Sequence, residues 1–514
     1  MIKKSYIESI FLIVLGAASS LSLPPYNYLI INFFTFSVFF IFLFKKSKII
    51  QAKINFFLYG WLFGFGYFLS SLYWISIALT FDQNFKFLIP LTIILIPAFL
   101  GIFYGCFTLC FIISKPKKII TSFFIFSLFF GIFEFIRGSI LTGFPWNLIA
   151  FSFVNQLEIL SVTSLIGTYG FNLFCISLFA SPAIFLLSQT KKNISISIVF
   201  LALPFLFYFY GSTYKETFFA SDKIIYDYKV RAIGSNISLD RFYSNIEPVS
   251  VIKDLIDISD PNKDDKTIFV WPEGILPDIY QKELVEYKWL FENRFNENHL
   301  LTIGTNSQAS KEGNTNYFNS LSIYDQNLNL LHDYNKVNLV PFGEFLPFEN
   351  ILKNIGLRVI TNNYYSFSRG NQREIIEINR EGFSLKILPL ICYEIIYSGK
   401  LFENQSFDLI INISEDGWFG NSIGPDQHFT HSVFRAIESG KYILRSANNG
   451  VAAIISPLGI VEKKVNFGKS GYIDFKESKK IKPTTFSKYG NKIFIILIFL
   501  YIFIIFSFNR IKNE

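Results

Sequence analysis

Long apolar runs alternate with short polar connections through the N-terminal part of the chain, and one more apolar run lies near its C-terminus. A helix that crosses a membrane needs about 20 mostly apolar residues. The pattern therefore predicts a membrane domain at 1–211 with seven spans, and an eighth span at 492–508. The predicted spans are 5–22, 27–44, 56–79, 87–114, 119–138, 158–189, 193–211 and 492–508.

The first apolar run also resembles a secretory signal peptide, because Lys3 and Lys4 precede it and small residues follow it. Further spans follow at once, so we favour a retained anchor. Lysines gather in alternate connections, as they do in cytoplasmic loops. Those loops carry Lys45, Lys46, Lys48, Lys53, Lys115, Lys117, Lys118, Lys191 and Lys192.

This charge pattern predicts that the N-terminus and a tail at 509–514 lie in the cytoplasm. Residues 212–491 are then expected on the far side of the membrane, in the periplasm or outside the cell. Polar and charged residues return there from about Lys223 onward. The segment is long enough for one large globular domain.

Short β-like runs alternate with helix-like stretches in this polar segment, and the latter are clearest at 281–294 and 427–441. A hairpin turn is expected at 326–329. The mixture predicts a layered α/β domain with buried strands. The expected strands are 228–237, 266–271, 300–305, 319–325, 385–391, 407–413 and 451–457.

The composition supports a membrane protein, because 51% of the 514 residues are hydrophobic and only 17% are charged. The net charge of +8 could indicate nucleic-acid binding. The cations lie largely between apolar runs, however, so we expect no nucleic-acid partner.

Cys392 is the only one of the four cysteines outside the strongly hydrophobic stretches. It therefore has no disulfide partner within the polar segment. A lone thiol is either a buried core residue or a reactive group, and taken alone the buried residue is the commoner case.

Three sequence blocks can carry chemistry: "WPEGILP" (271–277), "YNKVNLVPFGEFLP" (334–347) and "ICYE" (391–394). They offer Glu273, Lys336 with Glu344, and Cys392 with Glu394. Any one of these residues could be ordinary surface or core. Together, a carboxylate base, a cation for an oxyanion and a thiol nucleophile form a complete acyl-transfer set.

The order Glu273, Lys336, Cys392 resembles the catalytic triad of the nitrilase, or carbon–nitrogen hydrolase, superfamily. The 334–347 block is more specific, because it resembles the signature of the apolipoprotein N-acyltransferase family. In that family a nitrilase-like domain precedes the last of eight membrane spans. Similar matches are "EFIRGSILTGFPW" (134–146), "CYE" (392–394), "GWFGNSIGPDQHF" (417–429) and "RSANNGVAAIISPLG" (445–459).

The resemblance implies a multi-pass α-helical membrane domain with about eight spans, and an extramembrane α/β nitrilase-like domain, an αββα sandwich. It implies that Glu273 is the general base, Lys336 stabilises the oxyanion and Cys392 is the nucleophile. Glu344 then either orients Lys336 or shares its charge, and Tyr393 and Glu394 support the nucleophile.

Three aromatic residues are candidates for substrate binding. Trp146 is expected to help form the floor of the lipid path, and Tyr243 and Trp418 occupy family loop positions. The sequence departs from the family at Gly234, which replaces Gln, at Tyr243, which replaces Trp, and at Glu415, which replaces Asn. The triad is unaffected by these changes.

The implied reaction is a ping-pong N-acyl transfer. Cys392 takes an acyl chain from a phospholipid, and the α-amine of an apolipoprotein's N-terminal diacylglyceryl-cysteine resolves the thioester. No metal or other cofactor is expected. The implied location is the bacterial inner membrane, with a monomeric enzyme whose catalytic domain faces the periplasm.

Alternatives remain at this point. A membrane-anchored nitrilase-type amidase would resolve the thioester with water, and a non-catalytic scaffold or transporter would not use the triad. A Cys392–His428 dyad is possible, but it leaves the Glu and Lys blocks unexplained. His428 and His431 lack the further ligands of a metal site. Glu134 and Arg137 are either functional or a simple interfacial ion pair.

Overall fold

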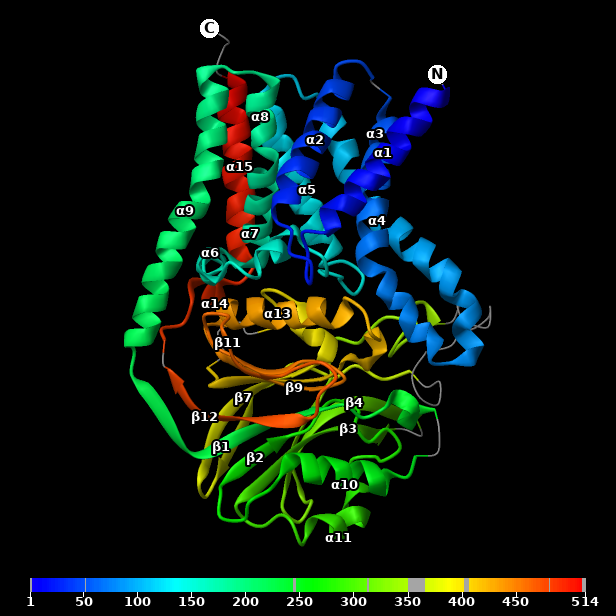
Figure 1. Ribbon diagram of the computed structural model, residues 1–514, viewed down its shortest axis with the longest axis vertical. Helices are drawn as coiled ribbons and strands as arrows, with labels where there is room; N and C mark the ends of the chain where they lie inside the picture. Colours follow the sequence, from blue (N-terminus) through cyan, green and yellow to red (C-terminus); the bar gives the residue numbers. More distant parts are fainter. Residues whose placement is uncertain are drawn as a thin grey trace.

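The computed structural model describes residues 2–50, 52–243, 246–311, 314–349, 366–401, 406–479 and 481–510. A bundle of long helices and a β-sheet domain are stacked along the longest axis (Figure 1). Both chain ends lie at the end of the bundle that points away from the sheet. Residues 511–514 of the predicted tail lie outside the described residues.

In the described part of the chain, seven helical segments are long and apolar enough to cross a membrane. An eighth apolar helix, Tyr6–Ser20, is shorter. Each corresponds to one of the predicted spans. The main helices are α1 (Ile2–Ser20), α2 (Ile30–Ser47), α3 (Lys53–Leu72), α4 (Ile89–Ile113), α5 (Ile119–Arg137), α7 (Thr163–Ala180), α8 (Pro182–Leu187), α9 (Lys191–Ala220) and α15 (Lys492–Arg510).

The helices pack closely through glycine and phenylalanine. A Cβ at Gly16 or Gly66 would lie 2.0 Å from a backbone oxygen of the facing helix, so only glycine lets α1 and α3 approach this closely. Phe39 and Phe63 stack with ring centroids 4.1 Å apart. Small residues at the contact therefore allow the backbones to meet, and aromatic rings fill the remaining space.

Two spans differ in detail from the prediction. The run at 158–189 forms α6 (Leu157–Leu160), α7 and α8, and α7 is kinked at Gly167, whose φ is 69°. A side chain at Gly167 would collide with the Phe486 ring at 2.0 Å, so the kink allows this close contact. The helix predicted to end at 211 continues to Ala220, because polar residues extend its last turns beyond the apolar run.

The β domain contains one twelve-stranded sheet within the described residues. Its main path is β5-β4-β3-β2-β1-β9-β8-β7-β6, with parallel pairing from β3 to β7 and antiparallel edges. The strands are β1 (Lys223–Ser235), β2 (Thr267–Val270), β3 (His299–Lys311), β4 (Asn314–Asp325), β5 (Leu330–Asn335), β6 (Ile376–Arg380), β7 (Phe383–Ile391), β8 (Leu409–Glu415), β9 (Tyr442–Asn448), β10 (Ala452–Ile455), β11 (Val461–Val465) and β12 (Gly471–Lys479).

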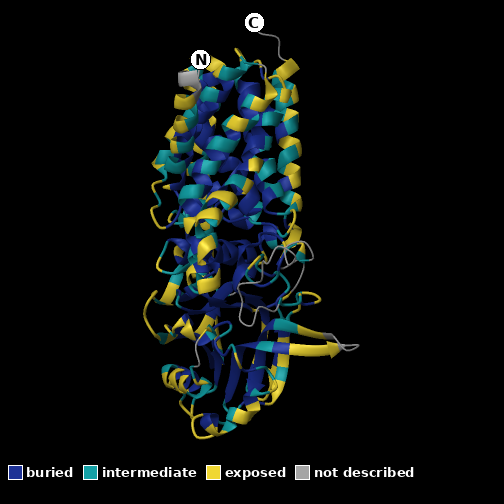
Figure 2. Ribbon diagram, turned by 90° about the vertical axis from the view of Figure 1, so that its right-hand side faces the viewer, coloured by how far each residue is buried: buried dark blue, intermediate teal, exposed yellow. Residues whose placement is uncertain are grey.

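The sheet folds into two layers with helices on both outer faces (Figure 1). Helix α13 (Gly424–Ser439) covers the layer nearer the membrane bundle, and α10 (Pro248–Ser259) and α11 (Lys288–Phe291) cover the other. This confirms the expected α/β sandwich. Buried residues fill the interior of both the bundle and the sandwich (Figure 2).

The local predictions in this domain were partly right. Each expected strand overlaps an observed one, and the turn at 326–329 joins the antiparallel strands β4 and β5. The helix expected at 281–294 is much shorter, with a 3₁₀ turn at Leu284–Tyr287 followed by α11. This helix ends early because the chain must turn back into β3. The backbone N–H of Phe295 donates to the carbonyl of Phe291 at the helix end.

Candidate active site

Cys392 lies at a sharp turn where β7 ends. The next residues form a 3₁₀ helix, Cys392–Ile396, and the φ of Cys392 is 46°. This left-handed conformation is uncommon for a residue with a side chain and is often found at functional sites. Only 8% of the residue is exposed. The turn therefore holds a buried thiol at the carboxyl end of a strand.

Glu273 and Lys336 follow the ends of β2 and β5, and their side chains meet in the interior. Lys336 Nζ donates to Glu273 Oε1 at 2.9 Å and to Glu344 Oε1 at 2.9 Å. Only 1% of Lys336 is exposed. One ammonium thus holds two carboxylates in a site shielded from water.

Asn319, at the middle of β4, completes this cluster and was not identified from the sequence. Its Nδ2 donates to Glu273 Oε1 and to Glu344 Oε1, both at 2.7 Å. The other oxygen of Glu273 accepts from the backbone N–H of Glu415 at 3.0 Å. No sequence signal pointed to Asn319, because an amide side chain in a strand usually has only a structural role.

The electrostatics of the cluster keep the lysine charged and the thiol neutral. Burial acts to lower the pKa of Lys336, but the carboxylates of Glu273 and Glu344 raise it well above its ordinary value. Burial, reinforced by the charge of Glu273, raises the pKa of the Cys392 thiol well above its usual range, and Lys336 opposes this effect. Attack by sulfur therefore needs a base that removes the proton during the reaction.

Glu344 belongs to the same charged cluster. Its Oε2 accepts from the backbone N–H of Val340 at 2.8 Å, which ties the carboxylate to its own loop. Burial raises the pKa of Glu344, and Lys336 opposes the shift. The expected role of Glu344 in orienting Lys336 is consistent with this geometry.

Glu394 joins the turn at Cys392 to the loop that carries Lys336. Its Oε1 accepts from Tyr334 Oη at 2.8 Å, from the amide of Val337 at 3.0 Å and from Arg373 Nη2 at 3.0 Å. Its Oε2 accepts from the amide of Ile391 at 2.9 Å. Glu394 is fully buried, so it fixes backbone positions and does not face a substrate.

The side chain of Tyr393 contacts the membrane part of the chain. Its hydroxyl donates to the carbonyl of Gly143 at 3.1 Å. Arg137 holds the same loop through the carbonyl of Phe144 and forms a buried ion pair with Glu134 at 2.6 Å. The Glu134–Arg137 pair therefore shapes the loop on which Tyr393 rests.

Trp146 lies at the interface between the bundle and the sheet domain and is only 2% exposed. Its Nε1 donates to Gln427 Oε1 at 2.9 Å, and its ring stacks on His428 with centroids 5.4 Å apart. Trp146 is therefore a buried packing residue. It is connected to the turn at Cys392 through His428.

Tyr243 and Trp418 lie together on two loops. Their ring centroids are 6.3 Å apart, and Trp418 also contacts Phe81 from the membrane part at 5.9 Å. Tyr243 is 39% exposed. The two rings therefore form an aromatic edge between the sheet domain and the bundle.

His428 contacts the backbone carbonyl of Cys392. Its Nε2 faces the carbonyl of Cys392 at 3.3 Å, so it donates there, and its Nδ1 lies 2.9 Å from Asp416 Oδ1. Burial lowers the pKa of His428. His431 packs edge-on against Phe151. This geometry does not support a Cys392–His428 dyad.

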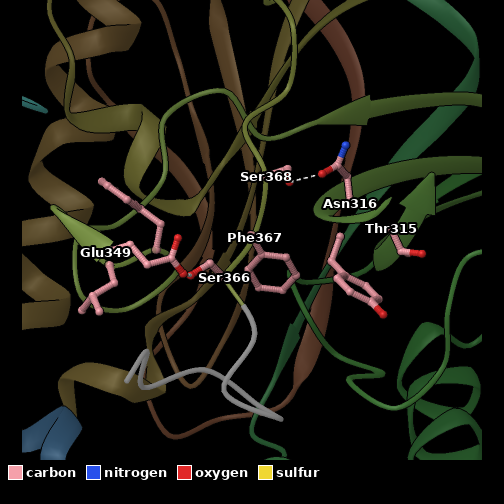
Figure 3. Close-up of a pocket in the computed structure, with 9 residues that line it drawn as sticks. Thr315, Asn316, Glu349, Ser366, Phe367 and Ser368 are labelled. Carbon is pink, nitrogen blue, oxygen red and sulfur yellow. Dashed lines mark hydrogen bonds between the residues drawn. The ribbon is translucent and has the colours of Figure 1, made fainter. Parts of the chain in front are cut away.

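A pocket of about 460 Å³ lies beside the loop that carries Glu344 (Figure 3). Ser368 Oγ donates to Asn316 Oδ1 at 3.2 Å across it, and the amide of Phe367 binds the carbonyl of Glu344 at 2.8 Å. The pocket is lined by Thr315, Asn316, Tyr317, Phe345, Leu346, Glu349, Ser366, Phe367 and Ser368.

Comparisons with known proteins agree with both parts of the fold. Residues 15–181 match the model of the apolipoprotein N-acyltransferase N-terminal domain, and residues 268–475 match that of the carbon–nitrogen hydrolases. Among solved structures, yeast Nit3 of the nitrilase superfamily is 14% identical, with a TM-score of 0.34, and covers 50% of this chain and 93% of its own.

Relatives similar over nearly the full length are named apolipoprotein N-acyltransferase. The protein from Rickettsia prowazekii is 33% identical over 99% of this chain and 100% of its own length. The protein from Rhodopseudomonas palustris is 30% identical over 94% of this chain and 92% of its own length. The chain therefore belongs to the apolipoprotein N-acyltransferase family.

Proposed function

We propose that this protein transfers an acyl chain from a phospholipid, through a thioester on Cys392, to the α-amine of the N-terminal diacylglyceryl-cysteine of bacterial lipoproteins. The observation that carries the proposal is the buried cluster of Glu273, Lys336 and Glu344 beside the strained turn at Cys392. Membership of the family supplies the substrate class.

In the first step, Glu273 takes the proton of the Cys392 thiol as sulfur attacks the ester carbonyl of the phospholipid. The oxyanion that forms is stabilised by the Lys336 ammonium, which is held in place by two carboxylates. The C–O bond then breaks, and Glu273 returns the proton to the leaving alkoxide. A lysophospholipid leaves, and an acyl thioester remains.

In the second step, the acceptor's neutral α-amine attacks the thioester carbonyl. Glu273 accepts a proton from the attacking nitrogen, the C–S bond breaks and the thiol is restored by that proton. The product is an amide. The acyl group is already activated, first as the ester of the donor and then as the thioester. Amide formation therefore needs no nucleotide.

We place the site near the outer surface of the bacterial inner membrane. Tyr393, next to the nucleophile, contacts the loop after α5, so the reacting sulfur lies close to the membrane part of the chain. In this arrangement 1–211 is the membrane domain, 212–491 is the periplasmic catalytic domain, 492–508 is the last span and 509–514 is cytoplasmic. A monomer contains all the groups that the two steps use.

The test is product analysis of the purified full-length enzyme with phospholipid and a synthetic diacylglyceryl lipopeptide. N-acylated lipopeptide and lysophospholipid are expected in equal amounts, and Cys392→Ala should form neither. Free fatty acid as the main product would contradict the proposal and favour an amidase-type hydrolase that resolves the thioester with water.

A further inference from the structure

A second buried ion pair lies next to the base, on loops that the two reaction steps do not use. Arg241 and Glu415 are bonded through Nη2 and Oε2, and both side chains are only 1% exposed. Arg241 lies in the short 3₁₀ helix Leu239–Phe242 after β1, and Glu415 is the last residue of β8. The pair therefore joins two loops that are far apart in the sequence.

Glu415 is connected to Glu273 through its own backbone. Its N–H donates to Glu273 Oε2 at 3.0 Å. Its side-chain oxygens accept from Asn448 Nδ2 at 2.7 Å and from the amide of Gly417 at 2.8 Å. The residue whose backbone N–H binds the base is therefore also fixed through its side chain.

Arg241 contacts the backbone next to Glu273. Its Nη2 lies 3.4 Å from the carbonyl of Gly274, the residue after Glu273, and its Nη1 donates to the carbonyl of Ser238 at 2.9 Å. The loop of Arg241 continues to Tyr243, which contacts Trp418 just after Glu415. The guanidinium of Arg241 thus connects the turn after Glu273 to the loops that carry Tyr243 and Trp418.

We infer that Arg241 and Glu415 are positioning residues, a buried ion pair that fixes the carboxylate of Glu273 and joins the Tyr243 and Trp418 loops. The inference deepens the proposed function, on which it rests. Arg241 is the cation that neutralises the buried charge at position 415. A buried charge that loses its partner disturbs its surroundings far more than removal of both charges does.

The test uses two single variants and their double variant. The Arg241→Met variant leaves the carboxyl group of Glu415 without its cation. The Glu415→Gln variant leaves the guanidinium of Arg241 without its anion. The double variant Arg241→Met/Glu415→Gln removes both charges with little change in volume. Each single variant should lower the rate of amine transfer at least tenfold, and the double variant should recover most of that loss.

The pH profile of the transfer rate separates positioning of the base from general structural damage. An unbalanced guanidinium in Glu415→Gln should move the acid limb to lower pH. In Arg241→Met the buried carboxyl of Glu415, whose pKa burial already raises, should become protonated and leave the acid limb in place. The shift in Glu415→Gln should be about one pH unit, the order expected for one buried charge close to the base. The other charged or titratable groups facing the base, Lys336, Glu344 and Cys392, are unchanged in all variants.

The matched control is Arg231→Met, which removes a buried arginine paired with Asp474 at the β1–β12 edge. It should lower the melting temperature without moving the acid limb. Single variants with the wild-type rate and profile, or a control that shifts the profile equally, would overturn the inference. A wild-type enzyme that forms no Cys392 thioester would instead overturn the proposed function.

Discussion

At the scale of single residues, the site depends on one buried ammonium that contacts two buried carboxylates. Lys336 is the one cation that contacts both Glu273 and Glu344 among the described residues, and Asn319 contacts the same two oxygens. Two carboxylates this close are stable as a pair only when a cation and donors lie between them. Lys336 and Asn319 therefore hold the two carboxylates together.

Asn319→Asp is expected to harm the enzyme more than Asn319→Ala. The alanine variant removes two hydrogen bonds, and we expect a 10- to 100-fold loss, about 1–3 kcal/mol of transition-state stabilisation. The aspartate variant adds a third buried carboxylate beside one lysine, so one carboxyl group becomes protonated. Single-turnover rates of thioester formation measure both, and equal rates for the two variants would contradict this account.

The thiol should react slowly with small alkylating agents in the resting enzyme. The folded-state pKa of Cys392 is raised, so the neutral thiol persists below that pKa and the thiolate appears only at higher pH. Alkylation by iodoacetamide should therefore be slow at pH 7 and rise steeply in the alkaline range. The measurement uses Cys106→Ala/Cys110→Ala/Cys175→Ala as background, and fast alkylation independent of pH would show a thiolate instead.

At the scale of elements, a close backbone contact positions Glu273, the proposed base. Gly304 of β3 lies directly below the turn of Glu273, where an added Cβ would meet the carbonyl oxygen of Pro272 at 2.4 Å and Glu273 Cα at 2.6 Å. The strand can approach this turn only because residue 304 has no side chain.

Gly304→Ala is accordingly expected to displace the backbone of Glu273. A shift of the base by about 1 Å should lower kcat about 100-fold. Steady-state kinetics and thermal unfolding are measured together. Full activity in Gly304→Ala would mean that the contact has no role in placing the base. The control Ala309→Gly changes one methyl group further along the same strand and should leave kcat unchanged.

The sequence predicted the elements with strong local patterns, and it missed those that depend on tertiary contacts. The apolar spans and the blocks around Glu273, Lys336 and Cys392 were recognisable because their patterns are local. Strand β9 was not predicted, since it is fully buried yet carries Arg445 and other polar residues. Asn319 and the Arg241–Glu415 pair were missed because their meaning comes only from partners distant in the sequence.

At the scale of the whole molecule, the architecture separates the chain ends from the site. Both ends lie at one end of the bundle, and the sheet domain lies at the other (Figure 1). The lysine-rich connections of the spans agree with cytoplasmic chain ends. The proposed acyl-transfer site, in the sheet domain, then lies on the side opposite to the chain ends.

This topology predicts opposite labelling of two exposed positions. A cysteine at Lys469, in the loop between β11 and β12, should react with a membrane-impermeant maleimide added to spheroplasts. A cysteine at Lys192, at the start of α9, should react only after the membrane is permeabilised. The Cys392→Ser background removes the native thiol of residues 212–491. Labelling of Lys192→Cys in intact spheroplasts would reverse the orientation.

The most direct test of the central claim is the intact mass of the detergent-solubilised enzyme after incubation with phospholipid and no amine acceptor. The account predicts one acyl-sized adduct, absent in Cys392→Ser, released by hydroxylamine and cleared when a diacylglyceryl lipopeptide is added. An unmodified enzyme with untouched phospholipid would contradict it, because the buried Glu273–Lys336–Cys392 site would then not perform acyl transfer.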